Sequence, residues 1–251
     1  YNASIRGFHR TVGNRRNEKG GRLKSNVVFF DIGNTLTVSG ELSPRRLLAH
    51  QLALSEKEAK LAGRLIMTHP ATDPSQLASA LSGVLRRHDA ETIRCVLERV
   101  WAEQYQAVRE VPGASALLEA LKSRGLRIGV ISNTWHPLYR GFCAAYPRLL
   151  EFIDYSVLSY RVGCKKPSPD IYARAVSISG EKAERCWMVG DSYEQDIEPA
   201  RNVGMRTLWV LRRPEKERGV LVKLLRGEQT PPDLLVEDLN QIDTLLKRKG
   251  L

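Results

Sequence analysis

Residues 27–37 read VVFFDIGNTLT, an apolar run that stops at an acid, a glycine and two threonines. The β-branched and aromatic side chains suit a buried strand, and Asp31, Gly33 and Asn34 are residue types that end one. In open α/β sheets, ligands bind beyond the carboxyl ends of parallel strands. The stretch therefore predicts a strand that carries Asp31 to a functional site, if other strand ends supply partners. An isolated Asp here would be an ordinary turn residue.

The composition excludes several classes of protein. The 251 residues fit one large domain, or one domain with a smaller insert, and the 42% hydrophobic and 27% charged residues are typical of a globular protein. The longest apolar runs are far shorter than the roughly 18 residues of a membrane span, and the N-terminus has no apolar signal region. The four cysteines are scattered, which favours reduced thiols over disulfides. We therefore expect a soluble, cytoplasmic protein.

The net charge of +11 is concentrated in two segments. Residues 1–25 contain seven basic residues and one acidic residue, and residues 212–227 contain six basic and two acidic residues. Basic segments of this kind can bind nucleic acid or an acidic partner through phosphate or carboxylate contacts. No nucleic-acid-binding motif accompanies them, so solvated arms are the simpler interpretation.

Residues 42–109 are helical in pattern. Residues 43–44 (Ser-Pro) predict a capped helix start, residues 55–58 (SEKE) a capping box, and residues 73–74 (Asp-Pro) the start of a third helix. Residues 89–108 carry apolar side chains at helical spacing, which we expect to be buried together: Ile93, Val96, Leu97, Val100, Trp101 and Tyr105. We expect an all-helical insert of roughly four helices, with no strand in it.

From residue 111 onward, strands and helices alternate. Expected strands cover residues 126–131, 155–158, 186–189, 207–211 and 234–236, with helices at 114–124, 138–145, 170–178 and 197–202 and another at the C-terminus. Such alternation predicts a doubly wound, mainly parallel sheet with right-handed crossovers. The predicted fold class is therefore α/β, with a Rossmann-like sheet and an inserted helical unit.

Polar side chains follow four of the expected strands. They are Asp31 and Thr35, then Ser132 and Asn133, then Lys166, then Asp191 and Asp196. Because the carboxyl ends of parallel strands share one edge of the sheet, residues far apart in sequence can meet there. Each residue alone would be read as a turn residue, a helix cap or a surface charge. Together they predict one site at that edge.

Four motifs in this order resemble those of the haloacid dehalogenase (HAD) superfamily. They are hhhDxxxTL around Asp31, hhhSN ending at Asn133, GxxKPxPxIY at residues 163–172 and GDxxxxD at residues 190–196, where h is apolar and x is any residue. The helical insert after the first motif resembles the C1 cap of subfamily I. The resemblance covers about residues 26–211 of the chain.

The resemblance also implies a division of the chain into parts. Residues 1–25 would be a basic N-terminal arm. Residues 26–40 and 110–251 would form the core domain, and residues 41–109 would form the helical cap domain.

A role for each polar residue follows from the same resemblance. Asp31 would attack a phosphoryl group and form an aspartyl-phosphate, which divides a difficult hydrolysis into two displacements. Ser132, assisted by backbone N–H groups near Asn133, would bind the phosphoryl oxygens. Lys166 would neutralise charge on the nucleophile and the phosphate, whereas we expect its neighbour Lys165 to face solvent.

The resemblance implies a magnesium site as well. Asp191 and Asp196 would hold Mg²⁺ directly or through water, together with one oxygen of Asp31 and the backbone carbonyl of Gly33. Hard oxygen ligands are those that Mg²⁺ prefers. The ion would reduce the repulsion between a carboxylate nucleophile and a phosphate.

Gly33 departs from the phosphatase pattern. Phosphatases of the superfamily carry a second Asp at this position, which protonates the leaving group and then activates water. Loss of a general acid or base typically costs about 10²- to 10⁴-fold in rate. We expect a Mg²⁺-dependent phosphatase acting on a small phosphorylated metabolite, with a preference for leaving groups that need little protonation.

Alternative functions stay open. A catalytically weak HAD domain would serve as a binding module through its basic segments. Phosphonate hydrolases have a small residue at the position of Gly33 and form a Schiff base on a cap lysine, for which the insert offers Lys57 and Lys60. Haloacid dehalogenases also lack the second Asp, but they do not use a Mg²⁺-binding pair such as Asp191 and Asp196.

Overall fold

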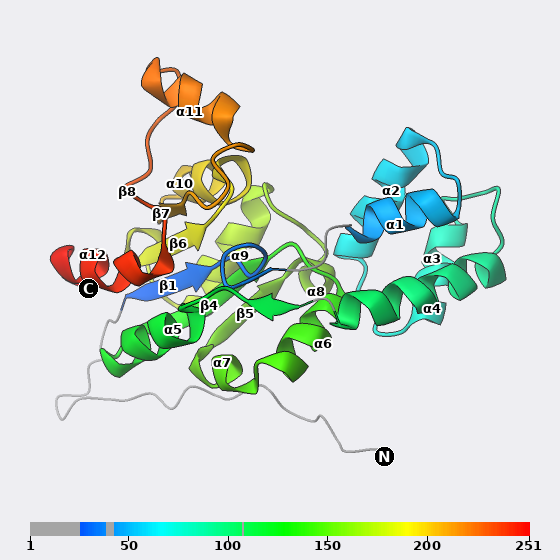
Figure 1. Ribbon diagram of the computed structural model, residues 1–251, viewed down its shortest axis with the longest axis horizontal. Coiled ribbons are helices and arrows are strands. Elements are labelled where there is room, and N and C mark those ends of the chain that lie inside the picture. Colours follow the sequence, from blue (N-terminus) through cyan, green and yellow to red (C-terminus); the bar gives the residue numbers. More distant parts are fainter. Residues whose placement is uncertain (1–25, 39–42, 107) are drawn as a thin grey trace.

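Strand β1 (Val27–Phe30) lies in the interior of a parallel sheet. The computed structural model describes residues 26–38, 43–106 and 108–251, so the expected basic arm of residues 1–25 lies outside the described residues. Within them the sheet has six strands in the order β5-β4-β1-β6-β7-β8 (Figure 1). Every pair of neighbours runs parallel. The predicted doubly wound α/β fold is confirmed.

The other elements fall largely where the alternation predicts them. The strands are β4 (Arg127–Ser132), β5 (Tyr155–Leu158), β6 (Cys186–Gly190), β7 (Arg206–Val210) and β8 (Leu234–Val236). The helices are α5 (Ala114–Ser123), α6 (His136–Ala145), α7 (Pro147–Phe152), α8 (Ser159–Val162), α9 (Pro169–Ser179), α10 (Glu198–Asn202), α11 (Arg218–Leu225) and α12 (Ile242–Arg248). Helices α7, α8 and α11 were not expected, because one or two turns are too short for a clear helical period.

Helices cover both faces of β1. Val28 and Phe30 pack in a cluster with side chains of α5, α6 and α12, whereas Val27 and Phe29 pack in a second cluster with side chains of α9 and α10. Successive side chains of a strand point to opposite faces, so a strand buried on both faces appears as a continuous apolar run. This is the physical reason why residues 27–30 predict a buried strand.

The expected helical insert consists of helices α1 (Pro44–Gln51), α2 (Glu56–Thr68), α3 (Pro74–Ser82) and α4 (Ala90–Gln106). Its three predicted starts are confirmed, because Ser43 caps α1, a capping box opens α2 and Asp73 caps α3. The capping side chains satisfy backbone N–H groups that have no partner within the helix.

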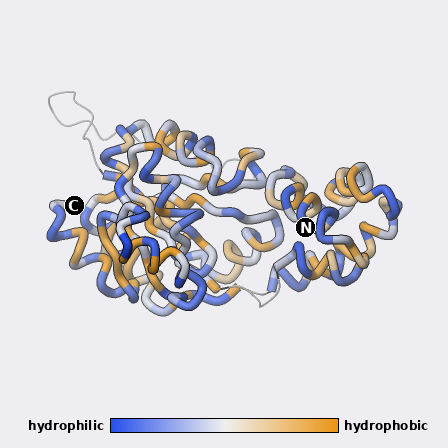
Figure 2. Tube along the Cα trace, turned by 90° about the horizontal axis from the view of Figure 1, so that it is seen from above, coloured by the Kyte–Doolittle hydropathy of each residue, from blue (hydrophilic) through white to orange (hydrophobic). Residues whose placement is uncertain are grey.

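The helical insert and the sheet have separate apolar interiors. Side chains of α1 to α4 form their own cluster, which also takes in Trp135 from the loop after β4. Figure 2 shows the two parts side by side, with hydrophobic segments running through each. The boundaries of the core and cap domains stay a prediction.

Two details of the helical insert were predicted wrongly. Arg109, expected at the end of the helical stretch, lies in strand β3 (Arg109–Glu110), which pairs antiparallel with β2 (Thr37–Val38). Strands of two residues are too short for alternation to appear in the sequence. Tyr105, expected on the buried face of α4, is 41% exposed. Its backbone carbonyl packs closely against Gly141 of α6, while its side chain points to solvent.

In the part of the chain that the structure describes, no helix has the length and hydrophobicity needed to cross a membrane. All four cysteines are free thiols, as predicted.

Candidate active site

The loop after β1 is fixed by its own backbone. The Asp31 amide donates to the Val189 carbonyl of β6 at 2.8 Å, which continues the sheet pairing beyond β1. The amides of Leu36 and Thr37 donate to the Ile32 carbonyl at 3.0 and 2.8 Å. The Thr37 hydroxyl donates to the same oxygen at 3.3 Å. These contacts hold Asp31 at the sheet edge, where it is only 6% exposed.

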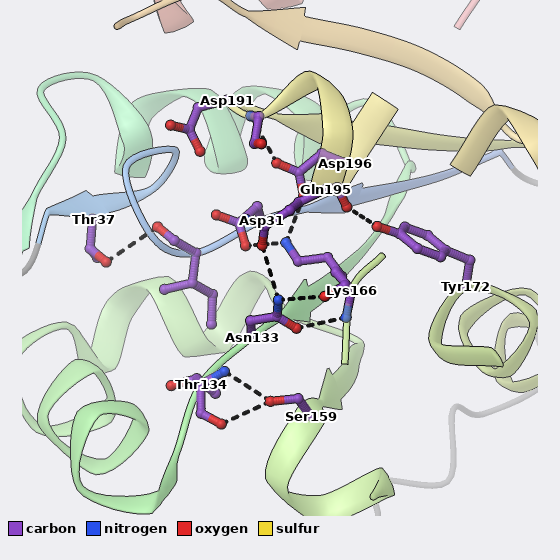
Figure 3. A network of polar contacts seen from close by, with 12 residues as sticks. Asp31, Thr37, Asn133, Thr134, Ser159, Lys166, Tyr172, Asp191, Gln195 and Asp196 are labelled. Atoms are coloured by element: carbon purple, nitrogen blue, oxygen red, sulfur yellow. Dashed lines mark hydrogen bonds and ion pairs between the residues drawn. The ribbon is translucent and has the colours of Figure 1, made fainter. Parts of the chain in front are cut away.

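Lys166 joins two of the predicted acids. Its ammonium group donates to Asp31 Oδ1 at 2.5 Å and to Asp196 Oδ1 at 2.6 Å (Figure 3). All three side chains are buried. Charge-assisted hydrogen bonds of this kind are short and strong, and they compensate the cost of burying the charges. The structure therefore brings together residues that lie 135 positions apart in the sequence.

Asp196 reaches the site from a π-helical turn, Tyr193–Ile197. Its Oδ2 accepts the Ser192 amide at 3.0 Å. The carboxyl group packs so closely over the end of β6 that a Cβ on Gly190 would collide with it. Position 190 therefore requires glycine because of the close approach of this side chain. Single π-helical turns are rare and are frequent at functional sites.

Asp191 is held by Arg213, which no motif indicates. Arg213 Nε donates to Asp191 Oδ2 at 2.9 Å, and Nη2 donates to the same oxygen. Trp209 Nε1 donates to the Asp191 backbone carbonyl at 3.0 Å. Arg213 lies just beyond the end of β7, at the same sheet edge as the acids. Its position just after an expected strand could have indicated a residue of the site. However, Arg213 is one of six basic residues in 212–227 and does not stand out among them.

Asn133 organises the segment that carries Lys166. Its Oδ1 accepts the Lys166 amide at 2.7 Å, and its Nδ2 donates to the Lys166 carbonyl at 3.0 Å. Nδ2 also donates to Gln195 Oε1 at 3.1 Å, and the Tyr172 hydroxyl donates to the Gln195 carbonyl (Figure 3). The Asn133 side chain therefore positions the lysine, a role that the sequence does not predict.

Gly33 and Ser132 line a small cavity beside the acids. The cavity has a volume of about 30 Å³, and its wall includes Leu138, Tyr139 and Phe142. A Cβ built on Gly33 would lie 3.8 Å from Asp31 Oδ2, an ordinary contact distance. A Cβ at position 33 would therefore be accommodated, and it would lie close to the Asp31 carboxylate.

Thr35, the other polar residue of the first motif, is fully buried. Its hydroxyl has no hydrogen-bond partner among the residues that the structure describes.

The site holds more negative than positive charge. The carboxylates of Asp31, Asp191 and Asp196 contact two cations, Lys166 and Arg213. Burial raises the pKa of Asp31 from 3.8 to about 7; Lys166 opposes this increase, and Asp196 and Asp191 add to it. Burial and Asp196 also raise the pKa of Asp191, against the attraction of Arg213. Burial alone would lower the pKa of Lys166, but Asp196 and Asp31 outweigh it, so the net pKa is raised and the lysine stays protonated.

The three carboxylates fit a divalent cation. Asp31, Asp191 and Asp196 each offer one oxygen, and these oxygens all lie within 4.8 Å of one another. Carboxylate oxygens are the ligands that Mg²⁺ and Ca²⁺ take in proteins. A divalent ion would also balance the negative charge of Asp196 and Asp191, which adds to the effect of burial on the pKa of Asp31.

The basic segment of residues 212–227 lies partly against this site. Arg213 pairs with Asp191, and Arg212 Nη1 donates to the Asn34 carbonyl at 3.4 Å. The remainder includes α11, which lies at the edge of the core (Figure 1) and packs through Val220 against Tyr193 and Trp209. Binding of nucleic acid or an acidic partner through this segment stays a prediction, and two of its cations already have partners at the site.

Comparison with known proteins agrees with this geometry. A family model described as haloacid dehalogenase-like hydrolase matches residues 26–204. Glyceraldehyde 3-phosphate phosphatase of Pyrococcus abyssi is 28% identical over 196 residues, which cover 73% of this chain and 80% of that protein. Glyceraldehyde 3-phosphate phosphatase of Methanothermobacter thermautotrophicus is 30% identical over 197 residues, which cover 73% of this chain and 84% of that protein.

A solved structure with the same fold is that of 2-haloacid dehalogenase from Pseudomonas syringae pv. Tomato. It superposes with a TM-score of 0.60 and 20% identity, covering 90% of this chain and 100% of that one. At this identity the likeness shows the fold alone. The family match spans most of the chain and includes the four strand ends of the site. The chain therefore belongs to the haloacid dehalogenase-like hydrolases, and it is a hydrolase.

Proposed function

We propose that the protein is a Mg²⁺-dependent phosphatase that acts on a small phosphorylated metabolite through an aspartyl-phosphate on Asp31. The observation that carries the proposal is the buried Lys166 ammonium bound to Asp31 and Asp196, with Asp191 beside them. A carboxylate nucleophile, a fixed cation and a divalent-metal site are the groups that phosphoryl transfer needs. The two relatives named as glyceraldehyde 3-phosphate phosphatases support this substrate class.

Asp31 has its two oxygens in different surroundings. Lys166 binds Oδ1, whereas Oδ2 lies toward Gly33. We assign Oδ2 as the nucleophile, so that its bond to phosphorus forms while the ester P–O bond breaks and the alcohol leaves with the electron pair. Water then attacks the aspartyl-phosphate, which releases phosphate and regenerates the Asp31 carboxylate.

Four groups would hold Mg²⁺: the carboxylates of Asp31, Asp191 and Asp196 and the carbonyl of Gly33. When bound, the ion would neutralise charge between the nucleophile and the phosphoryl group. Arg213 binds one oxygen of Asp191 and leaves the other for the ion.

Ser132 and the backbone near Asn133 would bind the phosphoryl oxygens. Ser132 is 3% exposed and ends β4, and it lines the same cavity as Gly33. Hydrogen-bond donors fixed in a buried site stabilise developing charge at little cost in reorganisation. Lys166 would add its positive charge, which its two carboxylate partners keep in place.

Phosphonate hydrolysis through a cap lysine is not supported by the helical insert. Lys57 and Lys60 lie in the first turns of α2 and are exposed, and Lys60 pairs with Glu56 at 2.6 Å. A lysine that forms a Schiff base requires a desolvated setting or a neighbouring cation that lowers its pKa. Lys57 and Lys60 have no such setting, because both are exposed.

We expect phosphate release to require Mg²⁺ and to depend steeply on the leaving group. Gly33 provides no proton, so aryl phosphates should react about 10²-fold or more faster than alkyl phosphates. The test is phosphate release from a series of aryl phosphates of graded phenol acidity and from an alkyl phosphate, with Mg²⁺ or with EDTA. Asp31→Asn is the control.

Two outcomes would contradict these expectations. Equal rates on aryl and alkyl phosphates would show that another group supplies the proton. Phosphate release that is unchanged in Asp31→Asn would overturn the phosphatase assignment and favour a catalytically weak domain that serves in binding.

A further inference from the structure

Three cationic side chains converge where the helical insert faces the core. Arg45 lies in the first turn of α1, and Arg64 lies in α2. Lys165 follows α8 and directly precedes Lys166. Helix α2 packs against α8, which brings the cations of the helical insert toward Lys165. We call Arg45, Arg64 and Lys165 the cationic cluster.

Arg45 and Arg64 are exposed, whereas Lys165 is partly buried. The side chain of Arg45 crosses α2 at Gly63, where a Cβ would lie only 2.7 Å from Arg45 Cδ and 2.8 Å from Cγ. The absence of a side chain at Gly63 lets Arg45 lie against α2 next to the position of Arg64 in the sequence. Lys165, expected from the sequence to face solvent, is half-buried. Burial, Arg64 and Arg45 all lower the pKa of its ammonium group.

No described residue neutralises the cationic cluster. Arg45, Arg64 and Lys165 make no side-chain hydrogen bond or ion pair within the described part of the chain. Other cations of the helical insert do have partners, for example Arg87, which pairs with Glu58 at 2.8 Å. Like charges held together without a counter-ion disfavour the charged forms. The cationic cluster is therefore complementary to an anion that none of the described residues supplies.

We propose that the cationic cluster binds a second oxyanion of the substrate, so that the substrate class is a small phosphate monoester with a further negatively charged group. The inference rests on the proposed phosphatase function. Guanidinium groups match the geometry of carboxylate and phosphate oxygens. Lys165 adjoins Lys166, whose ammonium binds Asp31, and consecutive Cα atoms are only about 3.8 Å apart. One residue of the cationic cluster is therefore the direct chain neighbour of the lysine that binds the nucleophile.

The test compares substrates that differ only in the second charge. Meta- and para-carboxyphenyl phosphate are matched with their uncharged carbamoyl isosteres, and kcat/KM is measured for each. The wild type should prefer the carboxylates by about tenfold, the size of one charge-assisted hydrogen bond. Arg64→Gln and Lys165→Gln should bring the ratio of carboxylate to carbamoyl kcat/KM close to one. Arg46→Gln, which neutralises the neighbouring exposed residue of α1, should keep the wild-type ratio.

Failure of this inference can be separated from failure of the phosphatase assignment. If the carbamoyl and carboxyl compounds are hydrolysed equally well by the wild type, the anion subsite is overturned and the phosphatase stands. If neither is hydrolysed, calorimetric binding of the same compounds to Asp31→Asn decides. A tenfold preference for the carboxylates that is lost in Asp31→Asn/Lys165→Gln supports the subsite, and equal affinities overturn it.

Discussion

Replacing Gly33 with aspartate should raise the turnover of an alkyl phosphate by about 10²- to 10⁴-fold, the usual contribution of a general acid. The site already places Asp31 against Lys166, with Asp196 and Asp191 beside them. A Cβ at position 33 would lie 3.8 Å from Asp31 Oδ2, an ordinary contact distance, so the new side chain would start beside the nucleophile. The surrounding carboxylates would raise the pKa of the new carboxyl group, which favours the protonated form that donates.

Gly33→Asn is the matched control for this substitution. It has nearly the same shape as Gly33→Asp but cannot transfer a proton, so its turnover should stay near that of the wild type. The gain from Gly33→Asp should also be smaller on aryl than on alkyl phosphates, because phenolates leave with less help. A similar gain with Asn, or none with Asp, would show that proton supply does not limit the enzyme.

Replacing Asp31 with asparagine should lower Mg²⁺-dependent phosphate release by about 10⁴-fold or more, because it removes the nucleophile. The same change should make the metal-free protein more stable near neutral pH and above. Burial raises the pKa of Asp31 to about 7, so the folded protein holds the ionised carboxylate at a cost. Asparagine removes that cost, and Lys166 keeps its partner Asp196 at 2.6 Å.

The stability difference should depend on pH in a defined direction. The pKa of Asp31 is about 7 in the folded protein and 3.8 in the absence of its surroundings, so the folded state binds the proton more tightly. The contribution of Asp31 to stability therefore falls as the pH rises from about 4 to about 7 and stays low above that range. The complete difference corresponds to at most about 4 kcal/mol in the free energy of unfolding.

Denaturant unfolding in EDTA, from about pH 4 to about pH 8, measures this difference. The exposed acid Glu151 of α7 provides the control, because Glu151→Gln should change neither turnover nor stability. A metal-free Asp31→Asn protein that is no more stable than the wild type above neutral pH would show that the buried Asp31 carboxylate does not destabilise the fold.

Much of this site can be predicted from sequence because two general rules suffice. A strand buried on both faces appears as an apolar run, which identified β1 and the strand before Asp191. Parallel strands share one edge for their carboxyl ends, which predicted that Asp31, Lys166 and Asp196 converge. The structure brings these three residues together.

The features of the site that the sequence does not predict depend on where side chains in loops point. Arg213 belongs to a basic segment, and only the fold shows that it turns inward to Asp191. Asn133 belongs to the second sequence motif, but the two hydrogen bonds from its side chain to the Lys166 backbone can be recognised only in the structure. Lys165 is half-buried, and it follows α8, which packs against α2 in a contact between distant segments that no local pattern records.

Asp31 itself should carry the phosphoryl group during turnover. Glycine at position 33 also provides no base to activate water, so hydrolysis of the aspartyl-phosphate should be slow. The aspartyl-phosphate should therefore accumulate when an aryl phosphate is supplied with Mg²⁺. The direct measurement is mass spectrometry of peptides from protein quenched in acid during turnover. We predict phosphorylation of Asp31 in the wild type and none in Asp31→Asn. Phosphate release with no modified Asp31, or with the phosphoryl group on another residue, would contradict the account.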